Sequence, residues 1–412
     1  MFNKSFIGNV FMISGCAMGS GCLAMPMLAA GPNFIFSSIF LILTGFFSYF
    51  LAAVSLEIFL LYKNDSNTST IVKNNFGQAG VVISGVINMA LMYALLSLYL
   101  TGGADLLSKT VFPVINLQVS HKISLMFFLI IFLPIFYKGA SLVVKSNKVI
   151  FYIKIFTFLT TLISGLAFIS KDLDAFVIEQ LKYIPRALPI FFGALWFHFV
   201  IPVIARINNY DRKSCHKVFA VGLTIPVIVY ILWIGVMLSL IPRDGVGHSF
   251  FVLLSKKESV GTMISYAIAN NSHIPHLTKI SLNLFSNFAL LTSFLVVGLS
   301  TYDYIRDALV IKQTTLGITK TLILTLLAPG IFALFFPNGF VVILQQAVIL
   351  LTLTNVIILL CSLKEYHRLE YKPNKLFIYI LLLLLFTIIG LQVLDNFSLL
   401  PSYGVSSGLF NK

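Results

Sequence analysis

Long apolar runs separated by short polar segments dominate this sequence from one end to the other. A bilayer's hydrocarbon core of about 30 Å takes about 20 apolar residues of helix, so each run of that length predicts one membrane span. The predicted spans are 6–31, 34–62, 81–107, 123–137, 147–170, 187–205, 218–241, 281–304, 318–337, 340–363 and 376–394. The pattern therefore predicts an all-α integral membrane protein with eleven transmembrane helices, of which the fourth is the shortest.

Composition excludes a soluble protein. Hydrophobic residues make up 58% of the 412 positions, charged residues make up 10%, and the mean hydropathy is +0.97. A soluble domain needs a polar outer face, whereas a bilayer solvates an apolar one directly. We therefore expect a single transmembrane domain over 1–412 with no soluble domain attached.

The net charge of +14 is informative because of where the cations lie. Nucleic-acid binding is one reading of a basic balance, but the lysines and arginines sit mostly in short loops between spans. There they act as topology signals, since cytoplasmic loops carry the excess of Lys and Arg. The distribution predicts a cytoplasmic N-terminus and a periplasmic C-terminus, with the lipid bilayer and no nucleic acid as partner.

Ten of the predicted spans divide into two halves of five, 6–170 and 187–363, and the helix at 376–394 is then an addition. Five is odd, so the second half has the opposite orientation in the membrane. Inverted repeats of this kind underlie many secondary transporters, which bind their substrates where the repeats meet.

The first helix of each half is interrupted near its middle. Gly19 and Gly21 precede Pro26 in span one, and Gly193 precedes Pro202 in span six. Glycine relaxes backbone sterics and proline removes a backbone donor. Broken helix at membrane depth is tolerated where it lines a polar cavity, so these stretches predict a solute site. Close helix packing through small residues is the alternative. A dinucleotide loop is excluded because no strand precedes the glycines.

Three stretches resemble the hydroxy/aromatic amino-acid permeases, in particular their tryptophan/tyrosine branch. They are Gly15–Pro26 followed by Ala29-Ala30-Gly31, Phe197-His198-x-x-Ile201-Pro202, and Thr292-Ser293-Phe294-Leu295-x-x-Gly298 followed by Tyr302-Asp303-Tyr304-Ile305-x-Asp307. The resemblance implies a LeuT-like fold of two inverted five-helix repeats plus one helix. It also implies proton symport of tyrosine or tryptophan by alternating access across the bacterial inner membrane, with no cofactor and with a proton favoured over sodium.

Two departures from the family pattern leave the substrate open. Trp196 and Phe199 flank His198 where the family has small residues, and Cys16 and Ala17 stand where hydroxyl residues are common. A carrier for a small neutral amino acid such as serine or alanine is therefore an alternative. A membrane-embedded enzyme using His198 with an acid such as Asp303 is a distant one.

The substrate is expected at the two interruptions. Backbone amides near the start of the second half-helix of span one suit a carboxylate, because a helix N-terminus carries positive partial charge. Carbonyls of both broken stretches suit the ammonium group, and aromatic rings of span six suit the side chain. The predicted substrate-binding residues are Gly15, Cys16, Gly19, Ser20, Gly21, Cys22, Phe192, Trp196, His198 and Phe199.

Lys154 is a candidate for proton coupling. An intramembrane lysine costs about 2.5–3.5 kcal/mol on insertion scales, which favours a functional reason for keeping it. Snorkelling to the inner interface is the alternative. In the wider amino-acid transporter fold, which the resemblance implies, a lysine on the fifth helix can take the place of an ion bound between helices one, five and eight. Thr292 and Ser293 on span eight would then lie beside Lys154.

Several charged residues lie near predicted helix ends. Glu57, Asp303, Arg306 and Asp307 fall at inner ends and predict an ion-pair network at an intracellular gate, with ordinary interfacial charges as the alternative. Asp105 falls near an outer end and is a candidate for a role at the outer gate. In the long outer connection, Val260–Ala269 is apolar enough for a short helix over the outer mouth.

The cysteines do not predict a disulfide framework or a metal site. Cys16 and Cys22 lie in the first span, whereas Cys215 and Cys361 fall at inner helix ends, so none has an outside partner. No His/Cys pair has zinc spacing, and we expect no metal.

Overall fold

The computed structural model describes residues 4–19, 21–63, 68–167, 177–270, 275–337 and 339–404, whose regular structure is helical. The long elements are α1 (Lys4–Ala17), α2 (Gly21–Ala29), α3 (Asn33–Tyr62), α4 (Thr68–Leu106), α5 (His121–Tyr137), α6 (Ala140–Leu166), α7 (Ile184–Ala194), α8 (Ile201–Ile207), α9 (Arg212–Leu240), α10 (Phe250–Ser255), α11 (Val260–Ala269), α12 (His276–Ala308), α13 (Thr315–Phe335), α14 (Phe340–Lys364) and α15 (Lys375–Asn396). Short turns of other helix type are η2 (Leu107–Val111), η3 (Phe112–Ile115), η5 (Ile178–Tyr183), η6 (His198–Val200) and η7 (Tyr366–Arg368).

The expected class, an all-helical multi-pass membrane protein, is confirmed. Within the described ranges, nine helical segments are long and apolar enough to cross a bilayer, and the bent pair α1 and α2 makes a tenth. Ten of the eleven predicted spans coincide with these segments. The predicted span at 123–137 coincides with α5, which has 17 residues and lies at the short end of the range for a span.

Two connections between predicted spans turn out to be partly helical. The connection at 63–80 contains the start of α4, which begins at Thr68 and is kinked at Gly77, where φ is +65°. The connection at 206–217 contains the start of α9, because Asp211 accepts a hydrogen bond from Ser214 N at 3.0 Å and caps the helix. Polar first turns hid both helix starts from hydropathy.

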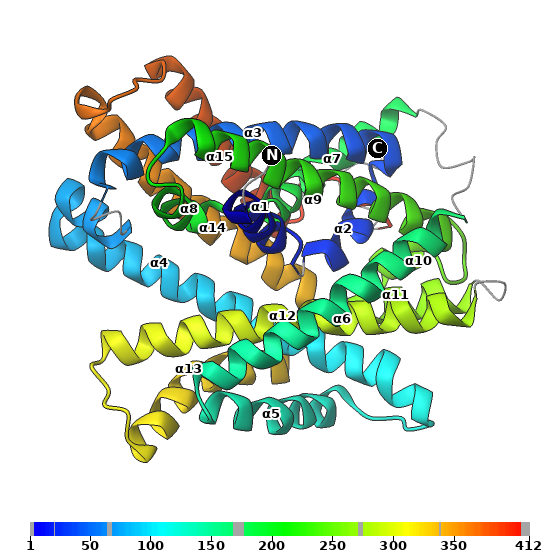
Figure 1. The fold of residues 1–412 in the computed structure, drawn as a ribbon. Helices are drawn as coiled ribbons and strands as arrows, with labels where there is room; N and C mark the ends of the chain where they lie inside the picture. The colour runs from blue at the N-terminus through cyan, green and yellow to red at the C-terminus, as the bar shows by residue number, and fades with distance from the viewer. Residues whose placement is uncertain are drawn as a thin grey trace.

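The helices pack as two groups. α1, α2, α3, α7, α8 and α9 contact one another, and α4, α5, α6, α12, α13 and α14 form the second group. Figure 1 shows α4, α12, α6, α13 and α5 below the first group, with α6 crossing α12 obliquely. Contacts of α9 with α6, and of α14 with α3 and α7, join the groups.

Small residues let the helices of the second group approach closely. A methyl group at Gly103 would lie 2.4 Å from the ring of Phe128, and one at Gly298 would lie 2.5 Å from the ring of Phe136. Both rings pack edge-on against the buried ring of Phe294. Membrane helices lack a hydrophobic driving force between them, so close packing of this kind holds them together.

The expected short helix of the outer connection is present as α11, at Val260–Ala269. Ser259 caps it, and buried Asp105 of α4 accepts a hydrogen bond from Gly261 N at 2.8 Å. A carboxylate at a helix N-terminus accepts a hydrogen bond from an N–H that has no partner within the helix, and it also interacts favourably with the helix dipole. Asp105 therefore anchors α11 to α4, and a role in gating stays a prediction.

Candidate functional site

Span one is broken where the sequence predicts. α1 ends at Ala17, α2 begins at Gly21, and the two axes are inclined at 55°. Cys22 N donates to Gly19 O at 3.3 Å as α2 begins. The predicted site residue Ser20 lies outside the described residues. The N-terminal end of α2 thus lies within span one and not at its edge.

Two side chains of α9 satisfy carbonyls that the break leaves free. Pro26 has no N–H, so Cys22 O lacks its usual donor four residues on. Trp233 Nε1 donates to Cys22 O at 2.9 Å, and the buried Tyr230 hydroxyl donates to Ala17 O. Neither α9 residue was among the predicted site residues. Pro26 signals an unpaired carbonyl, but the sequence does not identify its partner.

We expect Trp233→Phe to destabilise the protein, because the ring would still pack against Phe158 and Phe285 while Cys22 O loses its donor. An unsatisfied buried carbonyl costs about 1–3 kcal/mol. Thermal unfolding in detergent measures the change. Trp196→Phe is the matched control, because the Trp196 indole N–H has no hydrogen-bond partner among the described residues. An equal loss of stability in both variants would contradict this role.

Span six is broken in the same way. α7 ends at Ala194, the chain is non-helical at Trp196 and Phe197, and the one-turn η6 precedes α8. Trp196 N donates to Gly193 O at 3.3 Å, and Pro202 lies in the first turn of α8, where its missing donor costs nothing.

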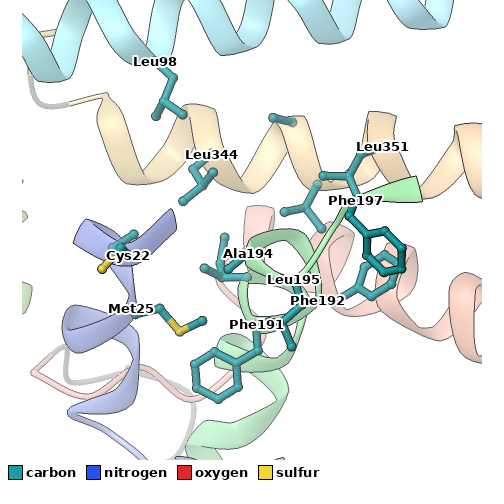
Figure 2. Close-up of a cluster of buried hydrophobic side chains, with 14 of the residues drawn as sticks. Cys22, Met25, Leu98, Phe191, Phe192, Ala194, Leu195, Phe197, Leu344 and Leu351 are labelled. Carbon is teal, nitrogen blue, oxygen red and sulfur yellow. The ribbon is translucent and has the colours of Figure 1, made fainter. Parts of the chain in front are cut away.

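The two breaks meet. A methyl group at Gly21 would lie 2.9 Å from Ala194 Cβ and 3.2 Å from Ala194 Cα, so only glycine permits this contact between the start of α2 and the end of α7. Figure 2 shows Cys22 and Met25 of α2 beside Phe191 and Ala194 of α7. Segments about 170 positions apart in the sequence therefore form one junction.

The aromatic residues predicted to bind substrate lie in two separate pairs. Phe192 and His198 are buried with ring centroids 6.4 Å apart, and His198 Nε2 lies 3.2 Å from Ser48 O of α3. Trp196 and Phe199 have centroids 5.0 Å apart, and Phe199 is 54% exposed. The structure thus does not gather these four rings around one pocket.

Lys154 faces the protein interior and does not snorkel. Its side chain on α6 is 4% exposed, and Nζ donates to Thr292 Oγ1 of α12 at 3.3 Å. The Thr292 hydroxyl in turn donates to Ala289 O at 3.1 Å, which leaves its lone pair for the ammonium group. Lys154 lines a cavity of about 20 Å³ with Met18 and Cys22 at the break of span one.

Ser293 completes this junction. Its Oγ would lie 3.6 Å from a methyl group placed at Gly19, so α12 approaches the break directly. Spans one, five and eight therefore meet around Lys154, Thr292 and Ser293, which is the arrangement that the resemblance implies. Gly15 and Cys16, on the last turn of α1, are half-buried beside it.

The sequence matches the tryptophan/tyrosine permease family over residues 2–392. The chain belongs to this family. It is therefore an amino-acid permease and not an enzyme, so the alternative of an enzyme using His198 and Asp303 is wrong.

Individual relatives agree with this assignment. The permease is 31% identical to the tyrosine-specific transport system 1 of Haemophilus influenzae, over 84% of each chain. It is 27% identical to a tryptophan-specific transport protein of Pseudomonas aeruginosa, over 82% of this chain and 80% of the other. The crystal structure of MhsT in complex with L-phenylalanine aligns with a TM-score of 0.60 at 15% identity, over 95% of this chain and 98% of the other. The permease thus has a LeuT-like fold.

Among the described residues, the charges predicted at inner helix ends form ion pairs in two separate clusters, and their role at a gate stays a prediction. Glu57, 3% exposed, pairs with Arg212 at 2.6 Å, and Arg212 also stacks on the Tyr371 ring at 3.5 Å. Arg306 instead pairs with its own helix neighbours, at 3.4 Å to Asp303 and 3.3 Å to Asp307. The partner of Glu57 is Arg212, which is not among the predicted gating residues.

We expect Glu57 and Arg212 to be energetically coupled, whereas Arg306 and Asp307 are not. Glu57 is buried and Asp307 is 74% exposed, and exposed pairs are worth about 0–1 kcal/mol. A double-mutant cycle with Glu57→Gln and Arg212→Gln, read by thermal unfolding, should give a coupling energy of about 1 kcal/mol or more. The matched cycle with Arg306→Gln and Asp307→Asn should give a value near zero. Equal values in the two cycles would contradict the distinction.

Proposed function

We propose that the permease imports an aromatic amino acid, tyrosine or tryptophan, by proton symport with alternating access. The observation that carries the proposal is the junction of Gly21 with Ala194, with buried Lys154 hydrogen-bonded to Thr292 beside it. Broken spans supply polar backbone at membrane depth, where a zwitterion can bind. The relatives described above are specific for tyrosine or tryptophan by name.

In this proposal the substrate carboxylate binds the amides at the start of α2, where the dipole is positive. The ammonium group then needs carbonyls. Ala17 O and Cys22 O of span one already accept hydrogen bonds from α9, so we place the ammonium group against the broken stretch of span six. Trp196 and Phe199 are the rings on that stretch that can turn toward a bound side chain.

Lys154 would carry the coupled proton. Its amine can exist with or without the charge inside the protein, whereas an arginine cannot lose its proton. With the proton, Nζ is a cation among spans one, five and eight. That charge would repel a second cation at the same position, which is why we favour a proton over sodium.

We also propose eleven spans arranged as two inverted repeats, 6–170 and 187–363, with a cytoplasmic N-terminus and the helix at 376–394 outside the repeat. Equivalent helices of the two halves contact each other in four places: α2 with α7, α3 with α9, α4 with α12 and α5 with α13. The first helix of each half is broken. A duplicated five-helix unit accounts for both features.

Counterflow in proteoliposomes tests the substrate. Vesicles preloaded with unlabelled amino acid should take up labelled tyrosine when loaded with tyrosine or tryptophan, and not when loaded with serine or alanine. A proton gradient directed into the vesicles should drive accumulation of labelled tyrosine in sodium-free buffer. Accumulation that requires sodium and ignores the pH gradient would overturn the proton assignment.

A carrier for a small neutral amino acid such as serine or alanine remains the second candidate. It is favoured by the cavity beside the break, which at about 20 Å³ holds about one water molecule. Counterflow of serine or alanine without tyrosine or tryptophan would select this candidate.

A further inference from the structure

An apolar groove runs between α3 and α9 on the protein surface. Its volume is about 440 Å³, within the range of sites that hold small molecules. On one side it is lined by Ile42, Gly45, Phe46, Tyr49 and Phe50 of α3. These positions share one helix face, because they recur every three or four residues.

The other side of the groove is one face of α9. Its lining residues are Ala220, Leu223, Thr224, Val227, Ile228 and Ile231. Buried Gly45 brings α3 close to α9, since a methyl group at this position would lie 3.0 Å from Val227 Cγ2. Phe46 on one rim and Ile228 on the other are 59% and 52% exposed. The hollow is therefore built into the packing of the two helices.

The groove has the length and direction of an acyl chain. From Ala220 to Ile231 the helix rises about 17 Å, which is slightly more than half of a hydrocarbon core of about 30 Å. The groove follows the helix axes, and both helices cross the membrane. One leaflet's acyl chain, lying along the helices, would have this extent.

One end of the groove is basic. Lys217 lies three residues before Ala220 and seven before Thr224, and Lys213 lies seven before Ala220, so both lysines continue the same face of α9. Both lysines are exposed. Asp211, the acid at this end of α9, is engaged in capping Ser214 N. Cations thus stand one and two turns beyond the apolar groove.

A polar pair marks the same end. The hydroxyl of Tyr49, which lines the groove, lies 3.1 Å from Nδ1 of His216, the residue next to Lys217, and both side chains are half-buried. An apolar groove that passes into hydroxyl, imidazole and ammonium groups matches a molecule with an apolar chain and an anionic head. A zwitterionic amino acid has no such chain.

We propose that this groove binds an anionic glycerophospholipid, with one acyl chain between α3 and α9 and the phosphate at Lys213 and Lys217. Basic residues beside membrane helices attract anionic headgroups, each at about 1 kcal/mol. The site does not depend on the proposed transport function. The proposed topology assigns it to the cytoplasmic leaflet.

The groove shares α9 with the transport site. Val227 lines the groove, whereas Val229 lines the cavity beside Lys154, and Tyr230 and Trp233 hold the broken span one. A lipid bound in the groove packs against the back of this segment. Removing the lipid should therefore also lower the unfolding temperature of the protein, because α9 loses these contacts.

The first arm of the test fills the groove. Thr224→Trp places a bulky ring in it from an exposed position, and Val221→Trp places the same ring on α9 at an exposed position that does not line it. The full chain, purified in mild detergent with equal phosphatidylglycerol and phosphatidylcholine, is examined by native mass spectrometry. We expect retained phosphatidylglycerol to fall about tenfold in Thr224→Trp, equivalent to about 1.4 kcal/mol, and to be unchanged in Val221→Trp.

The second arm removes the charges. Lys213→Gln with Lys217→Gln should abolish the preference for phosphatidylglycerol over phosphatidylcholine while keeping total bound lipid. Folding of every variant is checked by thermal unfolding, and Ala220→Phe serves as a second filling variant if Thr224→Trp unfolds. Equal lipid retention in the native protein and both filling variants, or no phosphatidylglycerol preference in the native protein, would overturn the proposal.

Discussion

Lys154→Ala is expected to abolish accumulation of substrate driven by a pH gradient while sparing exchange of substrate across the membrane. Lys154 is buried and hydrogen-bonded to Thr292 at the junction of α6, α12 and the break of span one. Without its amine the transporter can still alternate with substrate bound, but it has no group to carry the proton. Accumulation should fall by at least about tenfold, corresponding to about 1.4 kcal/mol of lost coupling.

The measurement compares uphill uptake with counterflow in the same proteoliposomes. Lys148→Ala is the matched control, because Lys148 is an exposed lysine on the same helix. Lys154→Arg separates proton transfer from the mere presence of a charge, since arginine keeps its proton. We expect it to behave like Lys154→Ala. Undiminished uphill uptake in either Lys154 variant would refute the proton role.

Gly21→Val should abolish both uptake and counterflow. Its Cβ would lie 2.9 Å from Ala194 Cβ, so α2 and α7 would have to separate at the junction of the two breaks. Overpacking of this kind costs about 1–3 kcal/mol and moves backbone, which would displace the amides proposed to bind the carboxylate. Counterflow of labelled tyrosine measures the loss directly, because counterflow needs binding but no proton gradient.

The control for this prediction is Gly8→Ala, also on span one, where a methyl group would meet nothing within 4 Å. It should transport normally. A milder pair tests the contact itself: Gly21→Ala should be impaired, and adding Ala194→Gly should restore part of the activity by removing the opposing methyl group. Full activity of Gly21→Val would mean that the approach of α2 to α7 is not needed for transport.

Some candidate site residues could be found from the sequence because each has a signal within a single span. Lys154 stands out as a cation inside an apolar run, and the breaks follow from glycine and proline within single spans. Thr292 and Ser293 were reached only through the family resemblance. The structure places Thr292 beside Lys154 and Ser293 beside Gly19, because α12 packs against both α6 and the break of span one.

Other partners had no such signal. Trp233, Tyr230 and Arg212 lie more than 150 positions from the groups they contact. Hydropathy treats them as ordinary residues of span seven or of an inner loop. In a membrane helix the lipid-facing and protein-facing sides are both apolar, so no amphipathic stripe tells which side chains turn inward.

The sequence by itself determined the helical membrane class, the positions of the spans and the two interruptions, because these depend on how each segment interacts with lipid and with its own backbone. Only the tertiary structure decided which residues meet: Gly21 with Ala194, Lys154 with Thr292, Glu57 with Arg212, and Asp105 with α11. Those contacts form between helices that are far apart in the sequence. Close packing and hydrogen bonding, and not hydrophobicity, determine which of these helices meet.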